Sequence, residues 1–353
     1  MAYKVGIIGT GFGVKVHFPA MNLHPDFEVK IIAGRNPDKT KQIGDQLGIQ
    51  STTNWKELIN DDELDIIAVT PPPYLHYKMA KATLLANKHL LLEKPTTTTA
   101  HQAKKLVSIA NDRGLIGMMC HEFRWDAHRQ FFEHLVKHKI GKIREFHGNQ
   151  FMSAWSDSDT SKWRWIADAI YDGGILGAAA SHYVDMIRST SGMEIAEVFG
   201  QTHIRVKQRV DGDGNYRKVT ADDGYTLMFE LENGATGVLN HSATINPAPD
   251  SHFIFGGDKG TAMLRGRTVL FGEAGDKLQE LEIPEEFRID TSTEEQDIRI
   301  PPFIKLLDAF AESLKEGKSK SPNLIDGWRN QQALDAVRLS HHTGNRIKIN
   351  NFI

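Results

Sequence analysis

The sequence is almost free of cysteine, because Cys120 is the single one among 353 residues. This excludes a disulfide framework and a zinc cluster built from several cysteines. Long hydrophobic runs are absent too, since the apolar residues 90–92 lie between Lys88 and Glu93 and fall far short of a membrane span. A strand-like pattern starts at Tyr3, without the basic and apolar regions of an export signal. We therefore expect a cytoplasmic protein.

Neither sign of charge is in excess. The 42 lysines and arginines nearly balance the 45 acidic residues, so the formal net charge is −3, and no dense basic block occurs. We therefore expect neither a nucleic acid nor a membrane surface as a partner. A composition of 40% hydrophobic and 25% charged residues is typical of a globular protein, and the length predicts roughly two domains.

The first 121 residues alternate between short apolar strands and helical patterns. Such alternation implies parallel strands joined by right-handed crossovers. We predict an α/β domain with a doubly wound parallel sheet over residues 1–121. Strands are expected at residues 5–9, 29–33, 65–70, 89–93 and 115–120, and helices at 14–23, from Asn36-Pro37-Asp38 onward, at 74–86 and at 99–112.

The pattern changes after residue 121. Runs of strands with a few helices indicate an α+β domain on a large, mostly antiparallel open sheet. We assign residues 122–353 to this second domain, and its last helix, near 326–342, is a candidate for packing back on the first domain. Strands are expected at 143–153, 198–207, 225–231, 236–242 and 252–255, helices at 174–190, 303–316 and 326–342, and a polar turn at 211–215.

A glycine-rich turn, Gly9-Thr10-Gly11-Phe12-Gly13, lies between the first expected strand and helix. A tight turn that presents backbone amides at a helix N-terminus suits the phosphates of a dinucleotide. The third glycine of the usual fingerprint would fall at Val14, one place after Gly13, which puts the close packing of helix on strand in question. A tight turn without a ligand is the alternative.

The end of the second expected strand carries no acidic residue. An NAD site needs Asp or Glu there to hold the ribose hydroxyls, but residues 31–36 contain none and include Arg35 beside Asn36. An arginine holds a 2′-phosphate through two parallel hydrogen bonds. We therefore predict NADP as the cofactor, with NAD as the second choice. A solvated surface arginine is the alternative for Arg35.

Short motifs follow these elements along the chain. They are Thr70-Pro71-Pro72 with His76, residues 86–89, Glu93-Lys94-Pro95, Trp163-Arg164, Asp172-Gly173-Gly174, and Ser181-His182 with Asp185. With these motifs the chain resembles, from Tyr3 to about Ile347, the glucose–fructose oxidoreductase/inositol dehydrogenase (Gfo/Idh/MocA) family. The resemblance implies an N-terminal Rossmann domain and a C-terminal domain whose open sheet often mediates oligomers, hence a homodimer or homotetramer.

The resemblance also implies an NAD(P)-dependent oxidoreductase that interconverts a secondary alcohol and a ketone on a polyol, sugar or sugar derivative. Lys94 matches the family lysine that bonds the reacting oxygen, where an ammonium group lowers the cost of alkoxide charge. An ion pair with Glu93 is the alternative for Lys94. Cofactor contacts are expected from the glycine turn and from Arg35, Asn36, Thr70, Pro71, Pro72, His76, Glu93, Lys94, Trp163 and Arg164.

His182 matches the family histidine that gives or takes the proton. Most members carry an acid four residues earlier, whereas this chain has Ala178 there. His182 would then act with Lys94 or with a partner that the sequence does not identify. Asp185 could face the same side of the helix. The alternative for His182 is a structural or substrate-binding histidine. The alternative for Trp163 and Arg164 is a packed ring beside a surface charge.

Further substrate contacts are expected after the last strand of the first domain. Glu122 and Arg124 leave that strand, where open α/β sheets bind their ligands, and they join Lys94, His182 and Asp185 in the expected substrate-binding set. A scaffold salt bridge is the alternative for Arg124. No metal is expected, since paired histidines such as His134 and His138 lack a third ligand at suitable spacing.

Two other functions fit the same resemblance. One is a redox-assisted lyase or glycosidase that uses tightly bound NAD transiently. The other is a regulator that senses a nucleotide without chemistry. Ala178 slightly favours the regulator, whereas the intact Glu93-Lys94-Pro95 motif favours an enzyme.

Overall fold

The computed structural model describes residues 2–157, 161–289 and 297–351. Its contacts divide the chain into two compact units, here called the first and the second unit. The first comprises Met1–Trp125 with Ile289–Gln331, and the second Asp126–Arg288 with Gln332–Ile353. The first boundary lies close to the expected one after residue 121. The segment from Ile289 differs from the expectation, because it belongs to the first unit rather than to the second domain.

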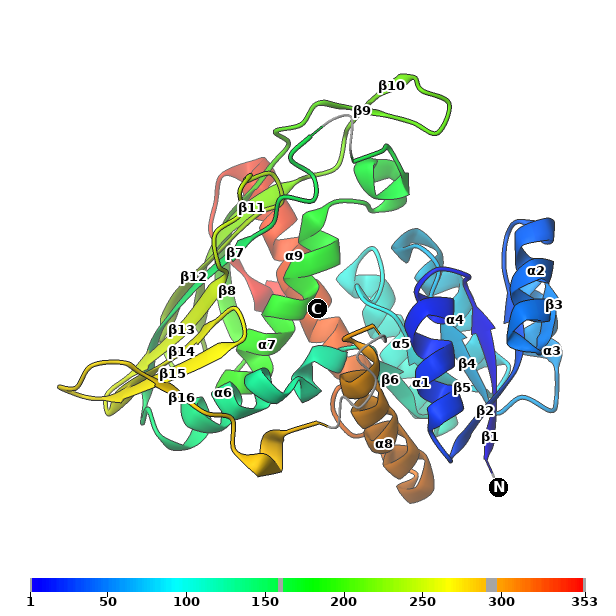
Figure 1. Ribbon diagram of the computed structural model, residues 1–353, viewed down its shortest axis with the longest axis horizontal. Coiled ribbons are helices and arrows are strands. Elements are labelled where there is room, and N and C mark those ends of the chain that lie inside the picture. Colours follow the sequence, from blue (N-terminus) through cyan, green and yellow to red (C-terminus); the bar gives the residue numbers. More distant parts are fainter. Residues whose placement is uncertain (1, 158–160, 290–296, 352–353) are drawn as a thin grey trace. The chain divides into compact units, whose positions relative to one another are not determined.

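The first unit is built on a six-stranded sheet in the order β3-β2-β1-β4-β5-β6 (Figure 1). Every neighbouring pair is parallel, which confirms the predicted doubly wound sheet. The sheet therefore ends in a single carboxyl edge. Its strands are β1 Tyr3–Ile8, β2 Phe27–Ala33, β3 Gln50–Thr52, β4 Ile66–Val69, β5 His89–Leu92 and β6 Gly117–Met119.

Helices pack on both faces of this sheet, which is why its central strands are continuous apolar runs. Successive strand residues point to opposite faces. Ile7 of β1 shares one core with Val16 and Phe303, whereas Ile8 shares another with Leu58. The helices of this unit are α1 Phe18–Leu23 after a π-helical turn at Gly13–His17, α2 Pro37–Leu47, α3 Trp55–Asn60, α4 His76–Leu85, α5 Ala100–Arg113, α8 Ile300–Glu316 and the start of α9 Leu324–Thr343.

Helix α8 explains why the segment from Ile289 joins the first unit. Its Phe303 and Phe310 are fully buried. Phe310 stacks on Phe27 of β2 with ring centroids 5.9 Å apart, and the Phe303 ring lies 4.4 Å from that of His17. Helical periodicity predicts this helix correctly, but periodicity does not reveal which sheet a helix covers.

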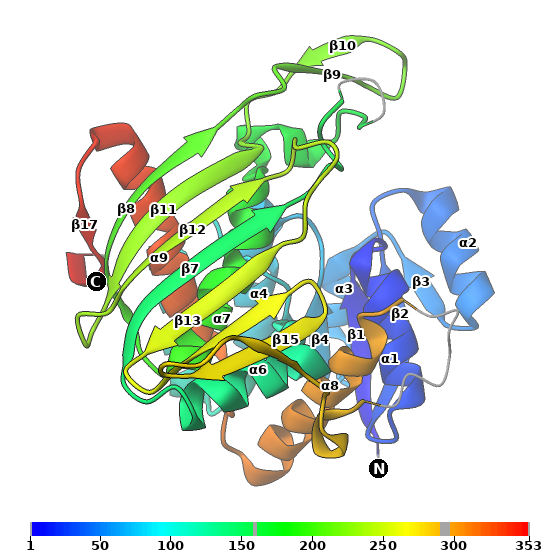
Figure 2. The same cartoon turned by 60° about the vertical axis from the view of Figure 1, so that its left-hand side comes forward.

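The second unit is built on a nine-stranded sheet in the order β16-β15-β14-β13-β7-β12-β11-β8-β17 (Figure 2). The pair β12 and β7 is parallel and the other neighbouring pairs are antiparallel. This confirms the predicted mostly antiparallel sheet. Its strands are β7 Ile143–Phe151, β8 Ile195–His203, β11 Gly224–Leu231, β12 Thr236–Ser242, β13 His252–Gly257, β14 Gly260–Arg265, β15 Thr268–Glu273, β16 Gln279–Leu281 and β17 Ile347–Lys348.

Three helical segments pack on one face of this sheet: α6 Ala127–His138, α7 Ser181–Ser191 and the later part of α9. Phe132, Ile187 and Val337 from these segments share a core with Phe255 of β13. Strand β11 alternates between buried and exposed side chains along its length, as expected for a sheet with one covered face.

Several finer expectations are also tested by the structure. The helix expected at 174–190 is divided into a π-helical segment at Leu176–Ala180 and the regular helix α7. The polar turn is confirmed between β9 Gln208–Val210 and β10 Tyr216–Lys218, where Asp211 Oδ1 accepts from the amides of Asp213 and Asn215. Strands β14, β15 and β16 are not predicted by the sequence analysis. Among the described residues, no helix combines the length and apolarity needed to cross a membrane.

Replacing Phe310 by Ala tests the assignment of α8 to the first unit. The change removes a fully buried ring that packs on β2, so we expect the free energy of unfolding to fall by about 3–5 kcal/mol. Urea denaturation measures this loss. Leu85→Ala is the control, because Leu85 is 45% exposed on α4 and its loss should stay within about 0.5 kcal/mol. Equal losses for the two variants would contradict the assignment.

Candidate active site

The glycine-rich turn follows β1 and lies tightly against β4. Gly9 has a φ of 122°, and a Cβ there would lie 2.4 Å from Thr70 Oγ1. A Cβ on Gly13 would lie 2.7 Å from both Ile7 Cγ2 and Thr70 Oγ1. Gly13 therefore supplies the close helix–strand packing that the fingerprint assigns to a glycine at the position of Val14.

Two features leave the backbone of this turn open to a ligand. A Cβ on Gly11 would meet nothing within 4 Å. No side chain caps the helical turn that begins at Gly13, so its first amides have no side-chain acceptor. Thr70 Oγ1 donates to the carbonyl of Ile8 at 3.0 Å and thereby fixes the turn from β4. This cradle fits the diphosphate of a dinucleotide.

The end of β2 lies beside the glycine turn. The Gly9 amide donates to the Ala33 carbonyl at 2.8 Å, and a Cβ on Gly34 would lie 2.5 Å from Thr10 Cγ2. Arg35 follows and is exposed, and its side chain makes no hydrogen bond or ion pair within the described residues. Helix α2 begins at the predicted start, and Asn36 caps it, because its Oδ1 accepts from the Lys39 amide at 2.9 Å.

His76 connects the loops that follow β4 and β5. It is buried, with Nε2 2.7 Å from the Pro71 carbonyl and Nδ1 2.8 Å from the Pro95 carbonyl. Burial lowers the pKa of this imidazole. The hydrogen bonds to the two carbonyls oppose this shift, because they favour the doubly protonated ring. Both ring nitrogens are thus used within the chain. The structure gives His76 a positioning role for the segment that contains Pro71 and Pro72.

Glu93 and Lys94 follow directly after β5, which ends at Leu92 rather than at residue 93. Glu93 is 6% exposed, and its Oε1 lies 2.9 Å from Nε2 of the fully buried His17. Burial alone would raise the pKa of Glu93, but the hydrogen bond and charge of His17 and the charge of Lys94 hold it below its usual value. Glu93 is therefore an ionised partner of His17, whereas Lys94 is half-buried beside it.

Cys120 completes a buried group with His17 and Glu93 that the sequence analysis misses. Its Sγ lies 3.8 Å from His17 Nε2, and burial together with the negative charge of Glu93 raises the pKa of the thiol well above its usual value. The donor atoms of the three residues lie within 4.8 Å of one another. Because the thiol is neutral and the carboxylate is paired, we interpret the group as a hydrogen-bonded cluster. These residues are 76 and 103 positions apart in the chain, so no local spacing reveals them.

Glu122 lies just after β6, on the same carboxyl edge. It is 1% exposed, and its Oε2 has no hydrogen-bond partner within the described residues. Burial raises the pKa of Glu122 to about 8, the charge of Glu93 acts in the same direction, and Lys94 and Arg299 oppose it. At neutral pH the two neighbouring acids therefore differ, since Glu93 is ionised and Glu122 holds a proton.

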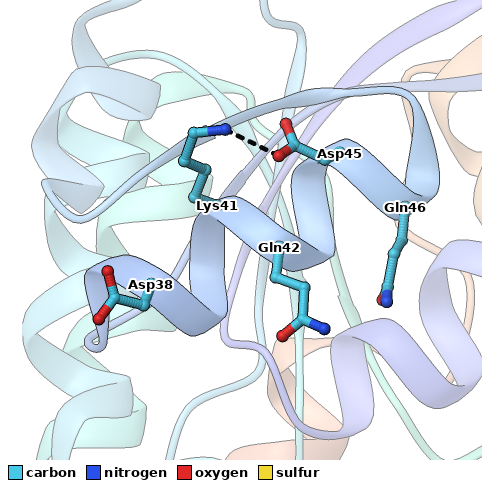
Figure 3. Close-up of a pocket in the computed structure, with 5 residues that line it drawn as sticks. All are labelled: Asp38, Lys41, Gln42, Asp45 and Gln46. Atoms are coloured by element: carbon cyan, nitrogen blue, oxygen red, sulfur yellow. Dashed lines mark hydrogen bonds and ion pairs between the residues drawn. The ribbon is translucent and has the colours of Figure 1, made fainter.

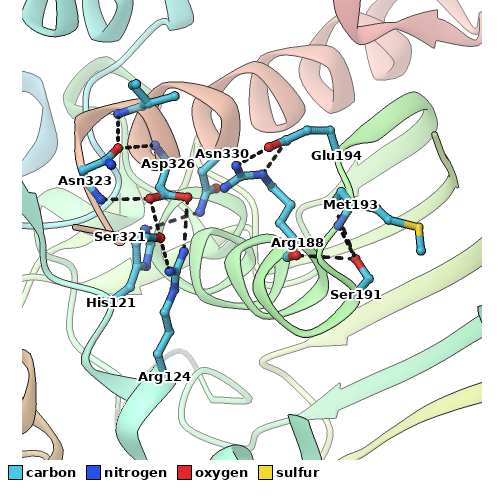
Figure 4. Close-up of polar contacts among 11 residues, drawn as sticks. His121, Arg124, Arg188, Ser191, Met193, Glu194, Ser321, Asn323, Asp326 and Asn330 are labelled. Atoms are coloured by element: carbon cyan, nitrogen blue, oxygen red, sulfur yellow. Dashed lines mark hydrogen bonds and ion pairs between the residues drawn. The ribbon is translucent and has the colours of Figure 1, made fainter. Parts of the chain in front are cut away.

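Arg124 makes scaffold contacts within the first unit (Figure 4). Its Nη1 donates to Ser321 Oγ at 2.6 Å, and its Nη2 lies 3.4 Å from Asp326 Oδ1 at the start of α9. Ser321 in turn donates to Asp326 Oδ2 at 2.7 Å. These contacts match the scaffold salt bridge that is the alternative for Arg124, and its expected substrate contact stays a prediction.

Trp163 and Arg164 belong to the second unit. Trp163 Nε1 donates to the Lys218 carbonyl at 3.1 Å, and the guanidinium of Arg217 lies 3.7 Å from the centre of the Trp163 ring. Arg164 is exposed. Trp163 is thus packed and Arg164 is a surface charge, which agrees with the alternative, and the expected cofactor contact of both residues stays a prediction.

His182 and Asp185 both lie on α7 of the second unit. His182 is half-buried and Asp185 is 2% exposed, one turn further along. Ala178 lies in the π-helical segment that precedes α7. A π-helical turn is wider than an α-helical one, so residues 178 and 182 do not have the regular spacing of one α-helical face. The missing acid is therefore accompanied by a changed helix geometry.

A shallow pocket lies on the outer face of α2 (Figure 3). It is lined by polar residues, and Lys41 Nζ pairs with Asp45 Oδ2 at 2.8 Å. None of the expected site residues lines it. The lining residues are Asp38, Lys41, Gln42, Asp45 and Gln46.

Known proteins resemble this chain in sequence and in fold. The model described as "Oxidoreductase family, NAD-binding Rossmann fold" matches residues 3–121, and the "GFO/IDH/MocA C-terminal domain" model matches residues 128–263. The chain is 26% identical over 385 residues to levoglucosan dehydrogenase of Pseudarthrobacter phenanthrenivorans, with 95% of each chain covered. It is 31% identical over 125 residues to scyllo-inositol 2-dehydrogenase (NADP(+)) of Bacillus subtilis, which is 35% of this chain and 34% of that protein. A solved complex of levoglucosan dehydrogenase with NADH and levoglucosan has the same fold, with a TM-score of 0.89 at 23% identity, covering 99% of this chain and 100% of that one.

The protonated state of Glu122 predicts a pH-dependent stability. Because its pKa is raised to about 8, the folded state binds more protons than the unfolded state up to that pH. The stability contribution is fully present below the ordinary carboxyl pKa and is lost as the pH rises from there to about 8, by at most about 1.4 kcal/mol per pH unit. Glu122→Gln should remove this decline.

Urea denaturation of wild type and Glu122→Gln across this pH range measures the effect. Glu57→Gln is the matched control, because Glu57 is exposed on α3 of the same unit and should leave the decline unchanged. Parallel curves for wild type and Glu122→Gln would contradict a protonated Glu122.

Proposed function

The chain belongs to the Gfo/Idh/MocA oxidoreductase family, and from this we propose an NAD(P)-dependent enzyme that prefers NADP and interconverts a secondary alcohol and a ketone. The substrate class is a sugar, a polyol or a sugar derivative, as the names of the levoglucosan and scyllo-inositol dehydrogenases suggest. The observation that carries the proposal is one sheet edge of the first unit. There the open glycine turn, Arg35 and Lys94 all follow parallel strands, where such sheets bind ligands.

The glycine turn would hold the dinucleotide. The open approach at Gly11 and the uncapped amides after it suit a diphosphate, and the segment from Thr70 to Pro72 would lie along the nicotinamide. His76 holds this segment through the Pro71 carbonyl. When bound, the nicotinamide accepts or gives the hydride, and the protein supplies binding and proton transfer.

Arg35 is the basis of the NADP preference. Its guanidinium is exposed at the end of β2 and engages no other described side chain, so it is available for a 2′-phosphate. The relatives support either cofactor, because the levoglucosan dehydrogenase complex contains NADH and the Bacillus enzyme is named for NADP(+).

Lys94 would handle the proton of the reacting hydroxyl. Its ammonium charge next to Glu93 favours an alkoxide that develops nearby, and once it has given up a proton its amine takes the hydroxyl proton during alcohol oxidation. His182 is the second proton-handling residue of the proposal, without the acid that Ala178 replaces. We further propose that the enzyme is cytoplasmic and forms a homodimer or homotetramer.

Lys94→Ala tests the chemical role. We expect turnover to fall by about 10²–10⁴-fold, because the proton-transfer group is lost, while the Kd of the dinucleotide stays within several-fold. Levoglucosan and scyllo-inositol are the probe substrates, followed by nicotinamide absorbance. Lys81→Ala is the control, since Lys81 is exposed on α4. Undiminished turnover in Lys94→Ala would disprove this role.

Arg35→Ala tests the cofactor preference. Loss of the charged hydrogen bonds should weaken NADP binding by about 1–3 kcal/mol and leave NAD binding unchanged. Calorimetric titration measures the two affinities. Lys41→Ala removes the same charge from α2, where Lys41 pairs with Asp45, and should spare NADP binding (Figure 3). An equal loss for both dinucleotides in Arg35→Ala would show that Arg35 is only structural.

A further inference from the structure

Two segments leave the parallel sheet side by side at its carboxyl edge. Strands β5 and β6 are neighbours, with Leu92 paired to Met119, and the Cys120 amide donates to the Leu92 carbonyl at 2.9 Å. Glu93 and Lys94 follow the first strand, and Glu122 follows the second. In this placement the charge of Glu93 raises the pKa of Glu122 and the charge of Lys94 lowers it.

The two acids at this edge have different surroundings. Glu93 accepts a hydrogen bond from His17 at 2.9 Å and is held as a carboxylate. Glu122 is 1% exposed, and no donor within the described residues reaches its Oε2. A buried carboxyl oxygen without a donor favours the neutral acid, and a carboxylate next to it strengthens this preference.

We propose that Glu122 is a positioning residue that exchanges the proton of the reaction with the amine of Lys94. The proposal rests on the proposed oxidoreductase function and deepens it. In alcohol oxidation the Lys94 ammonium gives a proton to the Glu122 carboxylate. The resulting amine takes the proton of the substrate O–H bond as that bond breaks, while hydride and its electron pair leave the substrate carbon for the nicotinamide. Alcohol, oxidised nicotinamide and Glu122 carboxylate thus become ketone, reduced nicotinamide and Glu122 acid.

The charged and titratable groups around Glu122 fit this exchange. Glu93 and Lys94 act on it from the loop after β5, and Arg299 acts from the residue before α8. The Cys120 thiol stays protonated, because burial raises its pKa and a negative charge on Glu122 acts in the same direction. His17 is engaged by Glu93. Of these groups, Glu122 is the acid whose titration falls near neutral pH and next to Lys94.

The exchange predicts opposite pH dependences for the two directions. Oxidation needs the Glu122 carboxylate, so its kcat should rise with pH through the titration of Glu122. Ketone reduction needs the Glu122 acid, so its kcat should fall over the same range. If Glu122 were merely structural, its titration would leave kcat unaffected in both directions.

The kinetic test compares wild type, Glu122→Gln and Glu122→Asp in both directions, with the probe substrates levoglucosan and scyllo-inositol. Glu122→Gln should lower kcat by about 10–100-fold with KM nearly unchanged and should abolish the pH-dependent limb. Glu122→Asp should restore the limb, and Glu57→Gln should keep the wild-type profile. A wild-type pH profile in Glu122→Gln would overturn the proposal.

Infrared difference titration supplies a readout that needs no turnover. A protonated carboxyl band should be present in wild type at neutral pH and absent in Glu122→Gln. In Lys94→Met it should persist to higher pH, because the positive charge that opposes protonation is gone. Absence of the band, or an unchanged titration in Lys94→Met, would overturn the proposal. A carboxyl band whose titration shifts in Lys94→Met, in a protein that turns over none of the substrates, would instead contradict the proposed function.

Discussion

The pairing of charges at the carboxyl edge of the parallel sheet depends on one buried carboxylate. Glu93 is 6% exposed, and a charge so deep in the protein is costly unless it is paired and hydrogen-bonded. His17 and the thiol of Cys120 meet this demand from other segments, and Lys94 adds a positive charge beside it. Burial raises the pKa of Glu122 and the ionised Glu93 nearby raises it further, so Glu122 keeps its proton at neutral pH.

The parallel sheet brings the residues of the proposed binding and chemistry to the same edge. Because all its strands run in one direction, the turn after β1, Arg35 after β2, the segment from Thr70 after β4 and Lys94 after β5 emerge at a single edge. Internal hydrogen bonds hold these loops. Thr70 fixes the glycine turn through the Ile8 carbonyl, and His76 joins the loops after β4 and β5. A ligand would thus meet a largely pre-formed surface.

Local signals in the sequence predict the parts that local physics controls. The cap at Asn36, the tight turn at Gly9 and the apolar strands follow from neighbouring residues, and the family resemblance is the source of the proposed role of Lys94. The pairing of Glu93 with His17 depends on residues 76 positions apart, so it is invisible before the sheet is assembled. The same holds for α8, whose periodicity predicts a helix but not the sheet that it covers. The π-helical segment around Ala178 has no distinct sequence signal that we recognise.

The most direct test of the account is a calorimetric titration of the folded, cofactor-free protein with NADP and, separately, with NAD. The open glycine turn and the exposed Arg35 predict that both dinucleotides bind and that NADP binds more tightly. Binding of neither dinucleotide would contradict the central claim that this sheet edge serves a nicotinamide-dependent oxidoreductase.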